Sequence, residues 1–436
     1  MKNWFNRTFL ITFDIISIFL VIVLAFFLRQ WCDCFERSAP ADLSNYLAFG
    51  LLYGTIISLL FVEGIYTKRY DFWQETQRIV KGVFLASIIL LAFLAMTKQS
   101  ESYSRFILMT TFIITAIILP LQKYYLKRLL FKIGTWKQTS TIIGEDTFFT
   151  KHVFKNPYLG YVLTDEHKAK TLFISSAIGV QALEKHLHEA LIHKQEVIFV
   201  PLVTNFDFSD AHIIHLFNAR SNLIIVENNL LSKTNQWIKK LLDTLLSILI
   251  FPLLLLIIGV IALLIKREDG GKIFFKQVRL GENGEEFVCY KFRSMQNNSD
   301  ELLANYLVEH PQEIINYEIY HKYDNDPRIT KIGSLLRKTS LDELPQIFNV
   351  LKGEMSLIGP RPYMPNERSK IGNNIDIILA VKPGITGLWQ VSGRNDVDFA
   401  SRIVLDVWYV RNWSIWNDIV IILKTIQVVL KRNGAY

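Results

Sequence analysis

Long apolar stretches dominate the first third of the chain. Four of them, at residues 9–28, 46–65, 80–96 and 106–121, approach the roughly 20 residues that a helix needs to cross a bilayer. The denser basic groups, at residues 2–7, 68–81 and 123–128, all fall on one side of these stretches. The positive-inside rule therefore predicts a four-helix transmembrane bundle over residues 1–135 with both ends in the cytoplasm. The first stretch is too long for a signal peptide and lacks a small-residue cleavage site.

Residues 136–230 have a different pattern, with short β-branched runs separated by segments of helical spacing. The runs are STIIG, TLFISS, EVIFVP and NLIIVE, and VQALEKHLHEALIH is one of the intervening segments. This alternation predicts a small Rossmann-like α/β domain with a parallel sheet. The turn after the first run, IGEDTFF, has one glycine and two acids where a dinucleotide-binding fold has a glycine-rich turn. We therefore expect a structural or regulatory role for this domain.

A fifth apolar stretch lies at residues 241–265. Two basic residues precede it and two follow it (Lys239, Lys240, Lys266 and Arg267), so the positive-inside rule places both of its ends in the cytoplasm. Pro252 lies near its middle, where it removes a helix hydrogen bond and bends the axis. We predict a re-entrant membrane helix that returns to the face it entered from. A proline-kinked full span is the alternative. The re-entrant form keeps an α+β domain within residues 231–436 on the cytoplasmic membrane face.

Composition supports a membrane protein and no nucleic-acid partner. Mean hydropathy is +0.24, and the formal charge of +8 is concentrated beside the apolar stretches. That placement fits membrane topology and contact with anionic lipid. The three cysteines, Cys32, Cys34 and Cys289, are too few for a disulfide scaffold and have no histidine or cysteine cluster beside them.

The last third of the chain holds the candidate chemistry. GGKIFFKQVRLGENGEEFVCYKFRSM predicts a β-hairpin that turns at GENG and ends in a basic cluster. Further basic residues stand beside turn glycines and prolines, and arginine forks suit phosphate oxygens. A set of basic residues could therefore surround a diphosphate: Lys291, Arg293, Arg337, Arg361 and Arg394. A surface ion pair is the alternative for each one taken singly.

The stretch TSLDELPQ has two interpretations. Ser340 and Glu343 have the spacing of a capping box at a helix start, although Pro345 fits poorly within the helix that such a box would begin. Alternatively, Asp342 and Glu343 are a functional pair, one a nucleophile and one a magnesium ligand, since a helix start stabilises carboxylates. The residues alone leave both interpretations open.

A resemblance favours the second interpretation. The matching stretches are FFKQVRLG, YKFRSM, DPRITKIGSLLRKTSLDELPQ, NVLKGEMSLIGPRP and KPGITGLWQVSGRN. In this order, from about residue 239 to the end, they resemble the bacterial sugar transferase family, the monotopic polyprenyl-phosphate hexose-1-phosphate transferases. The N-terminal half resembles the large members of that family. LDVWYVRNWSIWNDIVIILKT and the final GAY are most similar to its galactose-phosphate transferases.

The resemblance implies a reaction at the cytoplasmic face of the bacterial inner membrane. A UDP-sugar gives its sugar 1-phosphate to undecaprenyl phosphate and UMP is released, which is the first membrane step in making O-antigen, capsule or exopolysaccharide. It also implies that Asp342 forms a covalent phosphosugar intermediate and that Glu343, with Asp342, holds Mg²⁺. Substrate contacts would come from Lys291, Arg293, Arg337, Arg361, Gln390 and Arg394.

Two other functions remain open, and the sequence departs from the family pattern at one position. Asp324 and Asp326 form a D-x-D pattern, which would suit a metal-dependent glycosyltransferase that releases UDP. A non-catalytic scaffold for polysaccharide assembly is the second alternative. Phe251 precedes Pro252 where family members commonly have serine, which affects the expected depth or angle of the re-entrant helix. The bundle and the α/β domain offer surface for a homodimer.

Overall fold

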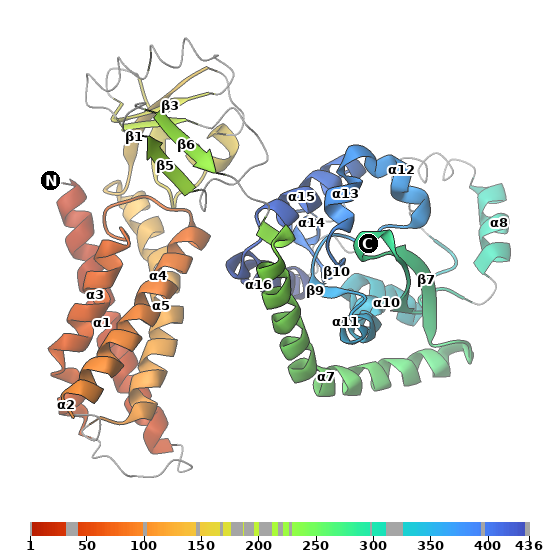
Figure 1. The fold of residues 1–436 in the computed structure, drawn as a ribbon, viewed down its shortest axis with the longest axis horizontal. Helices are drawn as coiled ribbons and strands as arrows, with labels where there is room; N and C mark the ends of the chain where they lie inside the picture. Colours follow the sequence, from red (N-terminus) through yellow and green to blue (C-terminus); the bar gives the residue numbers. More distant parts are fainter. Residues whose placement is uncertain are drawn as a thin grey trace. The chain divides into compact units, whose positions relative to one another are not determined.

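The structure is a computed structural model that describes residues 2–31, 42–98, 103–144, 149–165, 169–175, 186, 196–199, 212–216, 221–225, 229–296, 299–310, 326–393 and 397–431. The chain divides into two compact units, Met1–Leu202 and Val203–Tyr436 (Figure 1). We describe each unit by itself.

The first unit begins with long apolar helices. They are α1 (Lys2–Trp31), the short α2 (Leu43–Leu47), α3 (Gly50–Val62), α4 (Phe72–Met96) and α5 (Arg105–Ile133). The start of α4 is set by Asp71, whose carboxylate accepts a hydrogen bond from the Trp73 amide at 3.1 Å. Among the described residues of this unit, four segments are long and apolar enough to cross a membrane, and they include most of each predicted stretch. The length and apolar composition of these helices confirm the prediction of a membrane protein.

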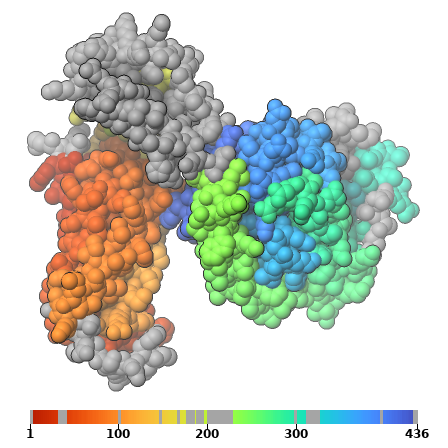
Figure 2. All heavy atoms as spheres, viewed as in Figure 1, coloured from red at the N-terminus to blue at the C-terminus, as the bar shows by residue number. Residues whose placement is uncertain are grey.

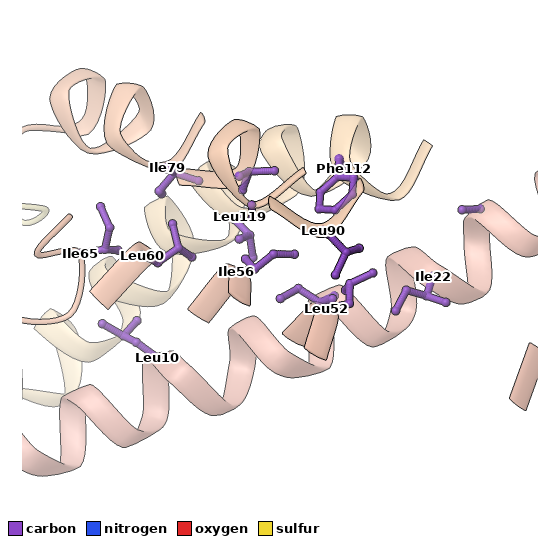
Figure 3. Packing of buried hydrophobic residues seen from close by; sticks show 14 of the residues in the cluster. Leu10, Ile22, Leu52, Ile56, Leu60, Ile65, Ile79, Leu90, Phe112 and Leu119 are labelled. Atoms are coloured by element: carbon purple, nitrogen blue, oxygen red, sulfur yellow. The ribbon is translucent and has the colours of Figure 1, made fainter. Parts of the chain in front are cut away.

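The four helical segments share one apolar core, in which side chains from α1, α3, α4 and α5 interdigitate (Figure 3). Ile56 and Leu60 of α3 are fully buried against partners such as Ile79 of α4 and Leu119 of α5. Many apolar side chains on the outer faces are exposed, including Phe84, Ile113 and Ile117. Helices that are apolar on both inner and outer faces suit a lipid environment.

Two buried ion pairs cross this bundle. Lys123 Nζ lies 2.7 Å from Asp14 Oδ2, which also accepts a hydrogen bond from the Tyr66 hydroxyl at 2.6 Å. Lys127 pairs with Glu75, and all four of these charged side chains are fully buried. Buried charges are expensive unless they are paired, and pairing gives Asp14 a role within the bundle.

A parallel sheet follows the helices. Its strands are β1 (Gln138–Ile143), β2 (Tyr161–Leu163), β3 (Thr171–Ile174) and β4 (Glu196–Phe199), in the order β2-β1-β3-β4. This confirms an α/β region with parallel pairing. The run NLIIVE differs, since β6 (Ser221–Ile225) pairs antiparallel with β5 (His212–Leu216) in a two-stranded sheet of the second unit. All of the segment VQALEKHLHEALIH except His186, and most of the turn IGEDTFF, lie outside the described residues.

The second unit contains α7 (Lys233–Asp269), a 37-residue helix with Pro252 near its midpoint. Figure 1 shows that this helix bends sharply about halfway along its length, and an interior proline is the expected cause. Its inner face packs through Ile258, Ile261 and Ile265, while its other faces expose many leucines. Figure 2 shows the light-green atoms of α7 along the outer edge of this unit.

Around α7 the chain builds a compact α+β unit. β7 (Phe274–Leu280) and β8 (Glu286–Phe292) form the predicted hairpin, which turns through residues 281–285. The remaining elements are α8 (Ser299–Glu309), α10 (Lys331–Thr339), α11 (Ile347–Lys352), β9 (Ser356–Ile358), α12 (Arg368–Ile371), α13 (Ile375–Leu379), β10 (Gly384–Thr386), α14 (Leu388–Val391), α15 (Phe399–Arg411) and α16 (Ile415–Lys431). β9 and β10 pair in parallel. A side chain at Gly384 would meet the Gly359 amide nitrogen at 2.0 Å, so this approach requires glycine.

Candidate active site

The acid pair lies on a short 3₁₀ turn, Leu341–Gln346, directly after α10. α10 is placed by its first turn: the Thr330 hydroxyl accepts from the Gly333 amide at 2.9 Å, and Gly333 lies against the backbone of Ser294. A Cβ at Gly333 would be 2.1 Å from the Ser294 carbonyl oxygen. Glycine is therefore needed to bring α10, and the acids after it, beside the end of β8.

Ser340 ends α10 in a left-handed conformation, with φ 58° and ψ 19°. Its amide bonds to the carbonyl of Arg337, and its side chain makes no cap hydrogen bond to the following turn. The capping-box interpretation of Ser340 and Glu343 is therefore wrong. The reason is that Ser340, which ends α10 and begins the 3₁₀ turn, has a left-handed backbone instead of the extended backbone usual for an N-cap. Pro345 lies within that 3₁₀ turn.

Lys291 of β8 and Glu343 form the central ion pair of the site, with Lys291 Nζ 2.6 Å from Glu343 Oε1. Burial of the Lys291 ammonium opposes its charged form, but the carboxylates of Glu343 and Asp342 outweigh that effect and raise its pKa. Burial, together with the charge of Glu343, raises the pKa of Asp342 to about 6, while Lys291 and Arg337 act against this rise. A half-buried carboxylate thus lies among two cations and a second carboxylate.

Arg337, in the last turn of α10, is fixed by a hydrogen bond from its Nε to the Ser294 hydroxyl at 2.9 Å. Burial lowers the pKa of its guanidinium and the nearby Asp342 carboxylate opposes that shift. Because an arginine remains protonated in proteins, Arg337 supplies a permanent positive charge beside Asp342.

A cavity of about 150 Å³ lies beside the ion pair, and four predicted residues line it: Lys291, Glu343, Arg361 and Gln390. Arg279, Gln346 and Trp389 also line it and were missed as site residues. Arg279 and Trp389 belong to the matched motifs FFKQVRLG and KPGITGLWQVSGRN, which were the available signal. The Arg361 guanidinium lies 5.6 Å from the Trp389 ring centroid, an arrangement that orients the arginine.

Asp406 of α15 holds the loop that carries Arg361. Its Oδ2 accepts from the Arg361 amide at 3.1 Å and from the Tyr363 hydroxyl at 2.8 Å. The side chain is fully buried, and Oδ1 has no partner among the described residues. Burial raises the pKa of Asp406 to about 7, against the effect of these hydrogen bonds.

Four other predicted positions are not part of this group. Arg293 forms an ion pair with Asp269, at the end of α7. Arg394 and Asp324 lie outside the described residues. Asp326 accepts two side-chain hydrogen bonds from Arg328, at 2.8 and 2.6 Å, one on each carboxylate oxygen. The D-x-D interpretation would need that carboxylate for a metal.

Asp342 and Glu343 suit a magnesium site completed by substrate and water better than a metal site built from protein side chains alone. No group of three or more His, Cys, Asp or Glu side chains in the described part of the chain could hold a metal. Mg²⁺ is usually bound by one or two carboxylates with substrate phosphates and water as its other ligands. Asp342 and Glu343 provide such a pair, and the charge of Glu343 is one cause of the raised pKa of Asp342, a repulsion that a cation would relieve.

Comparison with known proteins identifies the family of this chain. The model of the bacterial sugar transferase family matches residues 234–432. The undecaprenyl-phosphate galactose phosphotransferase of Salmonella typhimurium is 34% identical over 85% of this chain and 84% of its own length. A UDP-galactose-lipid carrier transferase of Erwinia amylovora is also 34% identical, over 85% and 84%. A UDP-glucose:undecaprenyl-phosphate glucose-1-phosphate transferase of Klebsiella pneumoniae is 39% identical over 47% of this chain and 43% of its own.

The molecule is a membrane protein whose second unit has a site of carboxylates and fixed cations. The chain belongs to the bacterial sugar transferase family. The predictions of that family and of a sugar phosphotransferase enzyme are confirmed.

Proposed function

We propose that this enzyme transfers hexose 1-phosphate from a UDP-sugar to undecaprenyl phosphate and releases UMP. The observation that carries the proposal is the grouping of Asp342, Glu343 and Lys291 beside a cavity lined by Arg361. Two relatives that match most of the chain are named for galactose transfer to a lipid carrier, so UDP-galactose is the favoured donor. The Klebsiella relative is named for glucose, which makes UDP-glucose the second donor to test.

In the first step, an Asp342 carboxylate oxygen attacks the phosphorus that carries the sugar. The bond from that phosphorus to the UMP oxygen breaks, and UMP leaves. In the second step, a phosphate oxygen of undecaprenyl phosphate attacks the same phosphorus, which frees Asp342 and forms the lipid diphosphosugar. Both steps need positioning and neutralisation of negative charge more than proton transfer.

Lys291, Arg337 and Arg361 would provide that neutralisation. Lys291 and Arg337 stand beside Asp342, and Arg361 lines the adjacent cavity. A cavity of about 150 Å³ is smaller than the roughly 300 Å³ at which whole-ligand pockets begin, so we assign it to a phosphate group rather than to the whole donor. Gln390 and Trp389 would border the bound group.

Asp342 and Glu343 would hold Mg²⁺, which would neutralise phosphate oxygens during transfer. Arg293 and Arg394 remain predicted substrate contacts from the resemblance, and a homodimer remains a prediction.

The bend of α7 supports a re-entrant topology. Both ends of the helix carry basic residues, and its exposed leucines continue past Pro252, from Leu249 to Leu253 and Leu256. A helix that enters the cytoplasmic leaflet and returns would place Asp342 at the membrane surface of the bacterial inner membrane, within reach of a lipid phosphate. The domain at residues 1–135 would then span the membrane, and the domains at 136–230 and 231–436 would lie on its cytoplasmic face.

The test is the identity of the released nucleotide. Purified full-length protein is incubated with Mg²⁺, undecaprenyl phosphate and UDP-galactose, with UDP-glucose and an acetamido-sugar donor in parallel. The proposal predicts that UMP is released only when Mg²⁺ is present. It also predicts that sustained turnover requires undecaprenyl phosphate. Release of UDP would contradict it and favour a glycosyltransferase.

A further inference from the structure

A second cavity in the same unit has a volume of about 580 Å³, and neither acid of the pair lines it. Its walls are the first part of α7, the connection between α11 and β9, residues just before β10 and the hairpin turn at Glu282. Five lysines line it (Lys233, Lys239, Lys240, Lys352 and Lys382), together with only two acids, Asp243 and Glu282. The cavity, which we call the lysine cavity, is therefore strongly positive.

One of these acids is already satisfied inside the protein. Asp243 accepts a hydrogen bond from the Ser356 hydroxyl at 2.6 Å and pairs with Lys239. Lys239 is itself 2.9 Å from Asp418. This pairing uses Lys239 and Asp243 for structure and leaves four lysines, Lys233, Lys240, Lys352 and Lys382, against one acid, Glu282. Several lysines around one space suit a phosphate, because Lys offers a compact charge with three donors.

The helix wall of the cavity continues into an apolar stripe. Lys233 and Trp237 line the cavity, and the row of side chains at four-residue intervals continues from Trp237 through Leu241, Leu245 and Leu249, winding gradually around α7. Their exposed fractions are 43%, 57% and 75%, and Trp237 is 64% exposed. Tryptophan between basic and apolar residues is typical of a membrane–water interface. A ligand that fits both surfaces has an anionic head and an apolar tail.

We propose that the lysine cavity binds the phosphate headgroup of an anionic membrane phospholipid, with an acyl chain along the stripe from Trp237 to Leu249. The bound lipid would hold the start of α7 at the membrane surface. The inference depends on α7 contacting the membrane and is independent of the phosphotransfer reaction, since none of the proposed reaction residues lines this cavity.

The test uses the purified full-length protein in detergent and native mass spectrometry with phosphatidylglycerol or phosphatidylcholine at equal concentration. The cavity variant is Lys233→Gln/Lys240→Gln/Lys382→Gln. The matched control, Lys272→Gln/Lys331→Gln/Lys370→Gln, removes the same charge from exposed positions of the same unit that do not line the cavity. Thermal unfolding of each variant shows whether it is folded.

We expect the parent and control to retain phosphatidylglycerol in preference to phosphatidylcholine, and the cavity variant to bind it roughly tenfold more weakly. A second variant, Leu245→Gln/Leu249→Gln, should also weaken lipid binding while it leaves the lysines intact. Equal retention by the cavity variant and the control, or no preference for phosphatidylglycerol, would overturn the proposal. Two other outcomes would also overturn it: displacement of the lipid by an equal concentration of inorganic phosphate, or a cavity variant whose sole change is a raised KM for undecaprenyl phosphate.

Discussion

Lys291 and Glu343, 52 residues apart in sequence, meet at 2.6 Å and join strand β8 to the turn that carries Asp342. The two side chains are 24% and 26% exposed, so solvent screens the pair only in part. The ion pair therefore both positions the turn and places a positive charge beside the acid pair.

Lys291→Met and Glu343→Gln should each lower the thermal stability of the enzyme. The double variant should lose less than the sum of the two, with a coupling of about 1 kcal/mol, because the second change no longer breaks a pair. The measurement is a double-mutant cycle: thermal unfolding in detergent of the parent, the two single variants and the double variant. Strictly additive losses would show that the pair contributes nothing to stability.

Asp342→Asn should reduce UMP release at least about a thousandfold, because an amide cannot act as the nucleophile. The fold should persist, since removing one of two adjacent carboxylates relieves repulsion. The matched control is Asp326→Asn, which changes the aspartate that pairs with Arg328 and should retain most of the activity. The reverse ranking of the two variants would favour the D-x-D interpretation.

Asp406 should make stability depend on pH. Its pKa is raised from 3.8 to about 7 in the folded protein, so the folded state holds a proton that the unfolded state has released. Stability from this group is therefore fully present below pH 3.8 and is lost as the pH rises to about 7, by on the order of 1.4 kcal/mol per pH unit.

Asp406→Asn should remove this dependence, because an amide mimics the neutral acid. The measurement is the unfolding temperature of the parent and the variant between about pH 4 and pH 8, where the difference between them isolates Asp406 from other titrating groups. Parallel curves for the two proteins would refute the assignment.

Gly333→Ala should displace α10 and the turn after it, since the new Cβ would lie 2.1 Å from the Ser294 carbonyl oxygen. We expect a loss of at least about 2 kcal/mol in stability, with a fall in activity. Gly259→Ala in α7 is the control, because a Cβ there meets nothing within 4 Å, and it should be neutral or stabilising by about 0.5–1 kcal/mol. Similar behaviour of the two variants would mean that the close approach is not required.

Periodic elements could be predicted from the sequence because a single local pattern determines each of them. The apolar stretches became helices, and the GENG hairpin pairs Phe274 with Phe292. The run NLIIVE shows the limit of this reasoning, since a β-branched run does not reveal whether its partner strand is parallel or antiparallel.

The site was predicted mainly through the resemblance, because its members are distant in sequence. Lys291, Glu343, Arg361 and Gln390 come from β8 and from three later segments, and only the fold gathers them at one cavity. Asp406 could not be found, because a single aspartate in an amphipathic helix resembles a solvated residue. The left-handed Ser340 was also missed, since this conformation is uncommon for serine.

The most direct test of the account is whether the protein itself becomes labelled. The parent enzyme and Asp342→Asn are each incubated with Mg²⁺ and a UDP-sugar labelled in the sugar-linked phosphate, without acceptor lipid, and are then denatured and analysed for bound label. We predict one labelled phosphosugar bound to the Asp342 carboxylate in the parent, discharged by added undecaprenyl phosphate, and none in the variant. Active enzyme that never carries the label, or label that persists in Asp342→Asn, would contradict the account.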